Sequence, residues 1–163
     1  MNYHNITHDD MLNGEGLRTV LWVSGCIHAC DGCHNRVTWD ENSGIPFDGD
    51  AKEEIFDSLS KDYIAGITFS GGDPFYPGNR ETILSLAKEI KEKFPDKTIW
   101  AYTGFTFDKV KDLEVINYLD VLVDGPFKKE LLSPNKHWVG SSNQRIVDVK
   151  ESMKEGHVVI KKD

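Results

Sequence analysis

Four short runs of β-branched and aromatic residues recur along the chain, and each is followed by small or turn-forming residues. They cover residues 19–23, 66–70, 98–102 and 121–123. Apolar runs of this length, bounded by turn signals, are typical of strands that are buried in a sheet. We therefore predict that these four segments are strands.

Amphipathic patterns with a period of 3.6 residues lie between these runs. They predict helices over residues 50–59, 79–94 and 107–119. The second helix has the clearest pattern, because Asn79 is suited to cap its N-terminus and Pro95 follows its last turn. Strands that alternate with helices imply a parallel sheet with right-handed crossovers.

Length and composition agree with a single α/β domain that spans residues 1–163. The chain has 163 residues, of which 39% are hydrophobic, as in ordinary globular domains. Two further apolar stretches near the C-terminus, residues 145–149 and 157–160, predict a hairpin.

The net charge of the chain limits the kinds of molecule that it is expected to bind. The formal net charge is −8, and an acidic chain is poorly matched to a nucleic acid backbone, which is bound through Lys and Arg. No apolar run approaches the roughly 20 residues that span a bilayer. The first ten residues are polar, unlike a secretory signal. We expect a cytoplasmic protein with neither a nucleic acid nor a membrane as its partner.

The most unusual residues follow the four predicted strands. The first strand is followed by the three cysteines, the second by residues 71–74, the third by Thr103 and Gly104, and the fourth by residues 124–126. In a parallel sheet, binding sites form beyond the carboxyl ends of the strands. The sequence therefore predicts that these loops meet in one site.

The chain has three cysteines, Cys26, Cys30 and Cys33. An odd number within one short loop does not form a disulfide framework and indicates metal binding or catalysis. Three thiolates can hold three corners of a cubane iron–sulfur cluster, which ordinarily takes four cysteines. One iron would then keep an open position at which a substrate can bind.

Zinc is the alternative that the residues leave open. Either His28 or His34 could complete a Cys3His site. Structural zinc sites usually join two separated ligand pairs, whereas all candidate ligands here lie between Cys26 and His34. The protein would then be a zinc-binding interaction module without catalytic activity.

The cysteine spacing, Cys-x3-Cys-x2-Cys after the first strand, resembles the signature of the radical S-adenosylmethionine (SAM) enzymes. Residues 13–26, 33–39 and 70–74 resemble the cluster-flanking segments and the glycine-rich loop of glycyl-radical-enzyme activases. Three further segments are similar to one subfamily, the anaerobic ribonucleoside-triphosphate reductase-activating proteins: WAYTG at 100–104, VLVDG at 121–125 and GSSNQR at 140–145. The resemblance covers roughly residues 1–147.

This resemblance implies a fold, a reaction and partners. The fold would be a shortened radical SAM core, a parallel-stranded partial (β/α) barrel with an open lateral mouth. A [4Fe-4S] cluster would cleave SAM reductively to a 5′-deoxyadenosyl radical. That radical would take hydrogen from the glycyl radical loop on the large subunit of the anaerobic (class III) reductase. A low-potential donor such as flavodoxin would supply the electron. Another glycyl radical enzyme, or a small molecule, is the alternative substrate.

The resemblance also assigns residues. Cys26, Cys30 and Cys33 would bind the cluster. The cofactor would be bound by the following residues: Gly32, Cys33, His34, Gly71, Gly72, Asp73, Thr103 and Asp124. Glycines allow a backbone to approach a ligand closely, although the same glycines are typical of an ordinary tight turn. The cluster and SAM would perform the radical chemistry, so no catalytic side chain is expected.

One position departs from the broader superfamily. The residue before the third cysteine is often aromatic there and packs near the adenine, whereas this chain has Gly32. The reductase-activating proteins are similar to this chain in having glycine there. The sequence leaves open what packs on the adenine, and His34, with the backbone of Gly32 and Cys33, is a candidate.

Overall fold

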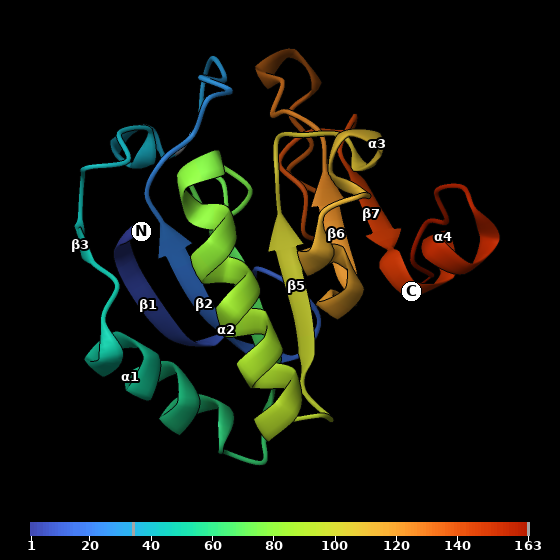
Figure 1. Ribbon diagram of the computed structural model, residues 1–163. Coiled ribbons are helices and arrows are strands. Elements are labelled where there is room, and N and C mark those ends of the chain that lie inside the picture. Colours follow the sequence, from blue (N-terminus) through green and yellow to red (C-terminus); the bar gives the residue numbers. More distant parts are fainter. Residues whose placement is uncertain (34, 163) are drawn as a thin grey trace.

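The computed structural model describes residues 1–33 and 35–162, whose strands form one seven-stranded sheet (Figure 1). The order across the sheet is β3-β1-β2-β4-β5-β6-β7. The strands are β1 (Asn2–Asp10), β2 (Leu17–Val23), β3 (Ile45–Pro46), β4 (Ile64–Gly71), β5 (Thr98–Tyr102), β6 (Val121–Asp124) and β7 (Arg145–Asp148). The α-helices are α1 (Gly49–Leu59), α2 (Arg80–Lys93), α3 (Phe107–Val110) and α4 (Val149–Glu155).

The four predicted strands are confirmed as the centre of the sheet, where β2, β4, β5 and β6 pair in parallel. The prediction of a wholly parallel sheet is wrong at both edges, because β1, β3 and β7 pair antiparallel. The α/β class is therefore correct and the sheet is mixed.

Two other expectations need correction. The predicted hairpin of residues 145–149 and 157–160 is replaced by β7, which pairs with β6, and by α4; a single bridge joins Val147 to Ile160. The predicted helix over residues 107–119 is divided into α3 and a 3₁₀ turn, Glu114–Tyr118. A backbone hydrogen bond from Leu113 to Val110 closes the turn between them.

The helices α1 and α2 cover one face of the sheet (Figure 1). Side chains alternate between faces along a strand, so Ile99 and Ala101 of β5 join the main core while Trp100 lies on the opposite face. There Trp100 packs in a smaller cluster that includes Trp138, which comes from an irregular loop. Tyr102 also packs against this smaller cluster.

Arg18 fixes the segment that leads into β2. Its side chain is 1% exposed, and all five N–H donors reach neutral acceptors on Glu15, Ile67, Thr68 and Thr98. Burial lowers the pKa of this guanidinium to about 10, although nearby acidic groups oppose the shift. The guanidinium thereby joins the loop after β1 to β4 and β5.

Among the described helices, none combines the length and apolar character needed to cross a bilayer.

Candidate functional site

The loops after β2, β4, β5 and β6 meet at one pocket of about 370 Å³. The ends of β2, β5 and β6 point toward this end of the molecule, at the top of Figure 1. The pocket is lined by all three cysteines, by Gly71 and Gly72, by Thr103 and Gly104, and by Phe127. The chain thus brings the cysteine loop and the glycine-rich loop to one cavity.

Backbone N–H groups approach all three thiols, and that of Asn35 donates to Cys33 Sγ at 3.4 Å. Those of His28 and Ala29 approach the Cys26 sulfur, and that of Phe127 approaches the Cys30 sulfur. Burial raises the pKa of the Cys26 and Cys30 thiols above the usual value and outweighs their hydrogen bonds. Backbone donors of this kind stabilise the thiolates that ligate an iron–sulfur cluster and tune its potential.

The donor set consists of three thiols, which are the usual ligands of an iron–sulfur cluster. The three cysteines are free and line one pocket. Among the described residues, no three Cys, His, Asp or Glu side chains converge closely enough to hold one metal ion. Zinc needs four ligands at about 2.0–2.3 Å, whereas a cubane is larger and its thiolates stand farther apart. His34, the other histidine considered for zinc, lies outside the described residues.

Gly71 and Gly72 bring the end of β4 against the cysteine loop. Gly71 has a φ of +106°, which side chains rarely adopt, and a Cβ there would collide with the Val23 backbone. A Cβ on Gly72 would lie 2.5 Å from the Gly25 carbonyl oxygen. The backbone N–H of Asp73 donates to that same oxygen at 2.7 Å. Glycine is therefore required for packing, and both residues still line the pocket.

Asp73 joins loops to one another. It is completely buried, and its carboxylate accepts hydrogen bonds from the Phe75 N–H, the Thr103 hydroxyl and the Gly104 N–H at 2.8–3.0 Å. His28 Nε2 lies 2.7 Å from the same carboxylate. These contacts connect the loops after β2, β4 and β5. The Asp73 carboxylate is thus hydrogen-bonded to groups of the protein itself.

The other residues assigned by resemblance have different positions. Thr103 lines the pocket while its hydroxyl donates to Asp73. Asp124 is buried and is bound by the Arg145 guanidinium at 2.5 Å and by the Phe107 N–H, so it caps α3. Gly32 faces Lys129 and Phe127 and is not among the residues that line the pocket. His34 lies outside the described residues, so its expected role in cofactor binding stays a prediction.

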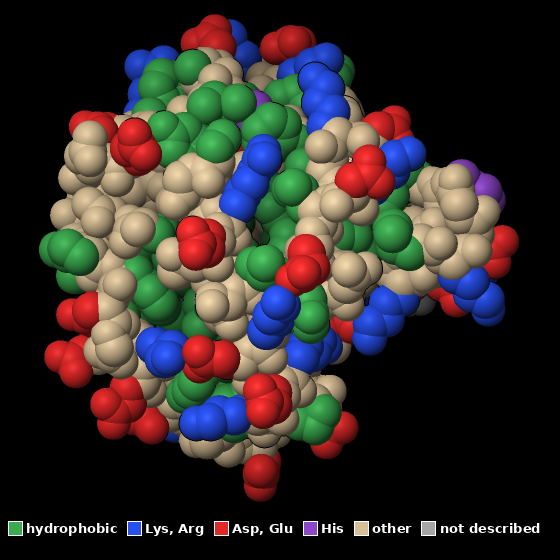
Figure 2. All heavy atoms as spheres, in the orientation of Figure 1, with side chains coloured by type: hydrophobic (Ala, Val, Ile, Leu, Met, Phe, Trp, Pro, Cys, Tyr) green, Lys and Arg blue, Asp and Glu red, His purple; other side chains and the backbone are tan. Residues whose placement is uncertain are grey.

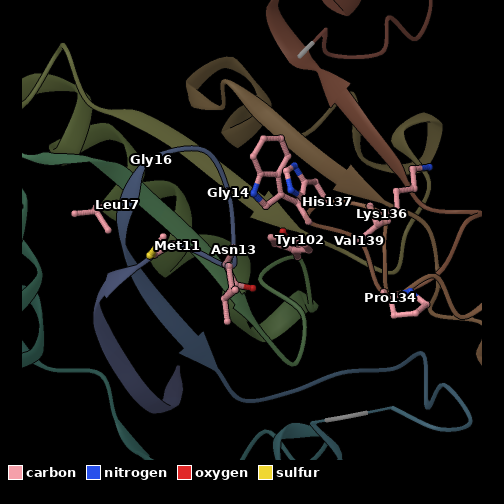
Figure 3. Close-up of a pocket in the computed structure, with 13 residues that line it drawn as sticks. Met11, Asn13, Gly14, Gly16, Leu17, Tyr102, Pro134, Lys136, His137 and Val139 are labelled. Atoms are coloured by element: carbon pink, nitrogen blue, oxygen red, sulfur yellow. The ribbon is translucent and has the colours of Figure 1, made fainter.

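A wider cavity of about 770 Å³ adjoins the cysteine pocket, since both are lined by Asn13, Tyr102 and Gly140. In Figure 3, Met11 lies on one side of this cavity and His137 on the other. The Tyr102 hydroxyl is buried and has no hydrogen-bond partner among the described residues. Burial also raises the pKa of Tyr102. Sequence reasoning missed Tyr102 as a site residue, because a tyrosine at a strand end looks like any core aromatic.

Comparison with known proteins agrees with this site. Residues 12–147 match a family model described as a 4Fe-4S single cluster domain. The anaerobic ribonucleoside-triphosphate reductase-activating protein of Enterobacteria phage T4 is 47% identical over 90% of this chain and 93% of its own length. Proteins of the same name from Escherichia coli (strain K12) and Haemophilus influenzae are 43% and 42% identical, over 88% and 90% of this chain and 96% and 97% of their own lengths.

The chain belongs to the family of anaerobic ribonucleoside-triphosphate reductase-activating proteins. The matched region contains the three cysteines, the loop with Gly71 and Gly72, and the 140–145 segment. In this member of the family, Gln144 of that segment lines the pocket, and its amide accepts from Gly140 and donates to Gly125. The segment therefore forms a wall of the site.

The surface around the site is partly apolar. Ile27, which follows Cys26, is 57% exposed, Val37 is 68% exposed, and Leu132 is 57% exposed. Figure 2 shows hydrophobic side chains at the upper end of the molecule, where the strands end, with charged side chains of both signs among them.

Proposed function

We propose that the chain is a radical SAM activase that removes a hydrogen atom from a glycine of anaerobic ribonucleoside-triphosphate reductase and leaves a glycyl radical on that partner. The observation that carries the proposal is the shared pocket of the three cysteines, Gly71 and Gly72. When bound, a reduced [4Fe-4S] cluster and SAM supply one-electron cleavage of a sulfonium carbon–sulfur bond. The names and the family of the relatives support the partner and the cluster.

Cys26, Cys30 and Cys33 would hold the cluster. The chain contains three cysteines, so it would leave one corner of a cubane cluster without a thiolate of its own. The N–H groups of His28, Ala29 and Phe127 would stabilise the thiolates. This arrangement suits a cluster that binds a small molecule at one iron.

The end of β4 and the facing loops would hold SAM. Gly71 and Gly72 expose backbone at the pocket wall, where the polar groups of a methionine moiety find partners. Phe127 lines the same pocket, and its ring lies 3.6 Å from where a Cβ of residue 32 would be. We infer that Phe127 packs on the adenine in place of the aromatic residue that Gly32 replaces.

Asp73, Thr103 and Asp124 would serve SAM indirectly. Their polar atoms are engaged with the His28 side chain, with backbone N–H groups and with Arg145. Because these hydrogen bonds fix the loops, the three residues shape the pocket rather than offer free ligand groups. For Gly32 and His34, a contact with SAM through the cysteine loop stays a prediction from the resemblance.

The wide cavity would admit the glycine-bearing segment of the reductase. It opens beside the cysteine pocket and shares Asn13 and Tyr102 with it. Hydrogen-atom removal needs the reacting carbon to reach SAM, and a macromolecular substrate needs an open path. A low-potential donor such as flavodoxin would deliver the electron, because cleavage demands a potential near the low end of iron–sulfur centres.

The test is anaerobic reconstitution with iron and sulfide, followed by incubation with SAM and dithionite. We expect 5′-deoxyadenosine and methionine in equal amounts. Cys26→Ala should lose the cluster and the products together. A fully loaded cluster without 5′-deoxyadenosine, with or without the reductase, contradicts the proposal.

A further inference from the structure

His28 provides a buried side-chain contact between the cysteine loop and the sheet edge. It stands between Cys26 and Cys30, and its side chain is 14% exposed. Its Nε2 lies 2.7 Å from Asp73 Oδ2. A carboxylate oxygen accepts hydrogen bonds, so Nε2 carries the hydrogen and donates it.

The acceptor of this hydrogen bond is itself held rigidly. Thr103 and Gly104 also donate to Asp73 Oδ2, and the Phe75 N–H donates to Oδ1. Asp73 is completely buried, and a buried carboxylate with several donors has one well-defined position. His28 therefore attaches the cysteine loop to a fixed point.

The structure also provides a fitted slot for the His28 ring. Phe105 packs edge-on against it, with 4.6 Å between the ring centroids. A Cβ on Gly104 would collide with three atoms of the His28 ring. Gly104 has no positive φ, so its backbone conformation does not require glycine. The space taken by the His28 ring excludes a side chain there.

The loop beside His28 adopts a conformation that needs support. Ala29 has a φ of +47°, in the left-handed region that non-glycine residues disfavour. This conformation accompanies the approach of the His28 and Ala29 N–H groups to the Cys26 sulfur. The ion pair of Asp31 with Lys129 also holds this loop, but both side chains are more than half exposed, and such pairs contribute little.

We propose that His28 is a positioning residue, which anchors the cysteine loop to Asp73 and holds it in its cluster-binding conformation before iron is bound. The inference rests on the proposed function for the identity of the cluster ligands. The hydrogen bond opposes the unfavourable conformation of Ala29 and keeps the N–H donors directed at Cys26. Loss of the anchor should loosen the loop without unfolding the sheet.

Two substitutions separate the hydrogen bond from the ring. His28→Phe keeps an aromatic ring against Phe105 and removes the donor, while His28→Gln keeps a donor of similar reach. Hydrogen exchange of the full-length apo protein reports on the loop amides that have acceptors, those of Cys26, His28, Ala29 and Cys33, with amides 67–70 of β4 as the internal control. In the reconstituted protein, an iron chelator measures the rate at which the cluster is lost.

For His28→Phe, we expect exchange of these four loop amides and cluster loss to become roughly tenfold to hundredfold faster, as for a lost buried hydrogen bond to a charged group. His28→Gln should stay within about threefold of wild type, since its donor replaces the lost one. Adding Ala29→Gly to His28→Phe should restore part of the protection, because glycine tolerates the left-handed conformation. Unchanged exchange in His28→Phe, or equal acceleration in both single variants, overturns the proposal.

The hydrogen bond from His28 to Asp73 can also be tested in the wild-type protein. In nitrogen-15 NMR of the apo protein, the His28 Nε2 hydrogen should exchange slowly with solvent, as expected for a buried hydrogen bond. Rapid exchange of that hydrogen overturns the proposal. The 5′-deoxyadenosine assay decides the proposed function separately, because loop exchange in the apo protein does not depend on SAM cleavage.

Discussion

Gly72→Ala tests the close contact on which the site depends. A methyl group at this position would lie 2.5 Å from the Gly25 carbonyl oxygen, whereas ordinary contact begins at 3.4 Å. A second backbone oxygen, that of Thr38, would lie 2.9 Å away. Both neighbours are backbone atoms, so no side chain can rotate away, and the two segments must separate by about 0.9 Å.

The expected loss in the free energy of unfolding follows from these contacts. Overpacking of this kind costs about 1–3 kcal/mol. The separation also stretches the hydrogen bonds from the Asp73 N–H to Gly25 and from the Gly72 N–H to Val23, each worth about 1 kcal/mol. We expect a loss of about 2–4 kcal/mol in the free energy of unfolding, which lowers Tm by roughly 6–12 °C for a domain of this size.

Gly49→Ala is the matched control. Gly49 begins α1, and no atom lies within 4 Å of its Cβ position, so the free energy of unfolding should stay within about 0.5 kcal/mol of wild type. Thermal unfolding of the apo proteins and iron content after reconstitution are measured side by side. Gly72→Ala should lose both stability and iron because Gly25 precedes the first cysteine. A Tm and an iron content equal to wild type would refute the packing argument.

Three further predictions rest on other contacts. Arg18→Met should lower the free energy of unfolding by about 3 kcal/mol or more in urea denaturation, because it removes the donors to buried acceptors on Ile67, Thr68 and Thr98. Arg18→Lys should be destabilised as well, because lysine lacks the planar guanidinium that reaches several acceptors at once. Burial raises the pKa of Asp120, but hydrogen bonds from Lys91, Ile99 and Lys150 outweigh it and hold the pKa below its usual value. The ionised carboxylate therefore stabilises the fold at pH values above the usual carboxyl pKa. Asp120→Asn should lower Tm at neutral pH, and this difference should vanish as the pH falls through the depressed pKa of Asp120. A Tm difference that does not change with pH would contradict this. Phe127→Ala should weaken SAM binding to the reconstituted protein roughly tenfold in calorimetry, while Phe127→Tyr should bind as wild type does.

The centre of the fold could be predicted from sequence because its strands are buried on both faces. The runs around Val20, Ile67 and Leu122 consist mostly of apolar and β-branched residues, and these three side chains are fully buried. β1 is not predicted from the sequence because it lies near the sheet edge and is mostly polar. Among residues 2–10, Ile6 is the one side chain that is less than a tenth exposed. The helix expected at 107–119 failed because apolar spacing does not reveal that α3 ends at Val110.

The site could be predicted in position but not in detail. Cysteine spacing and strand order place the cysteines and Gly71 in one pocket, and the structure brings them together. Asp73 and Asp124 are indistinguishable in sequence from ligand-binding acids. Only the folded contacts show that His28 and Arg145 engage them. Pairing between side chains that are far apart in sequence leaves no local pattern to read.

The most direct test of the proposed activity is electron paramagnetic resonance of the anaerobic reductase. It is mixed with the reconstituted chain, SAM and a low-potential reductant. We predict a glycyl radical signal on the reductase that appears with stoichiometric 5′-deoxyadenosine and is absent with Cys26→Ala. A loaded cluster that cleaves SAM while the reductase stays free of the radical would contradict the proposed activity.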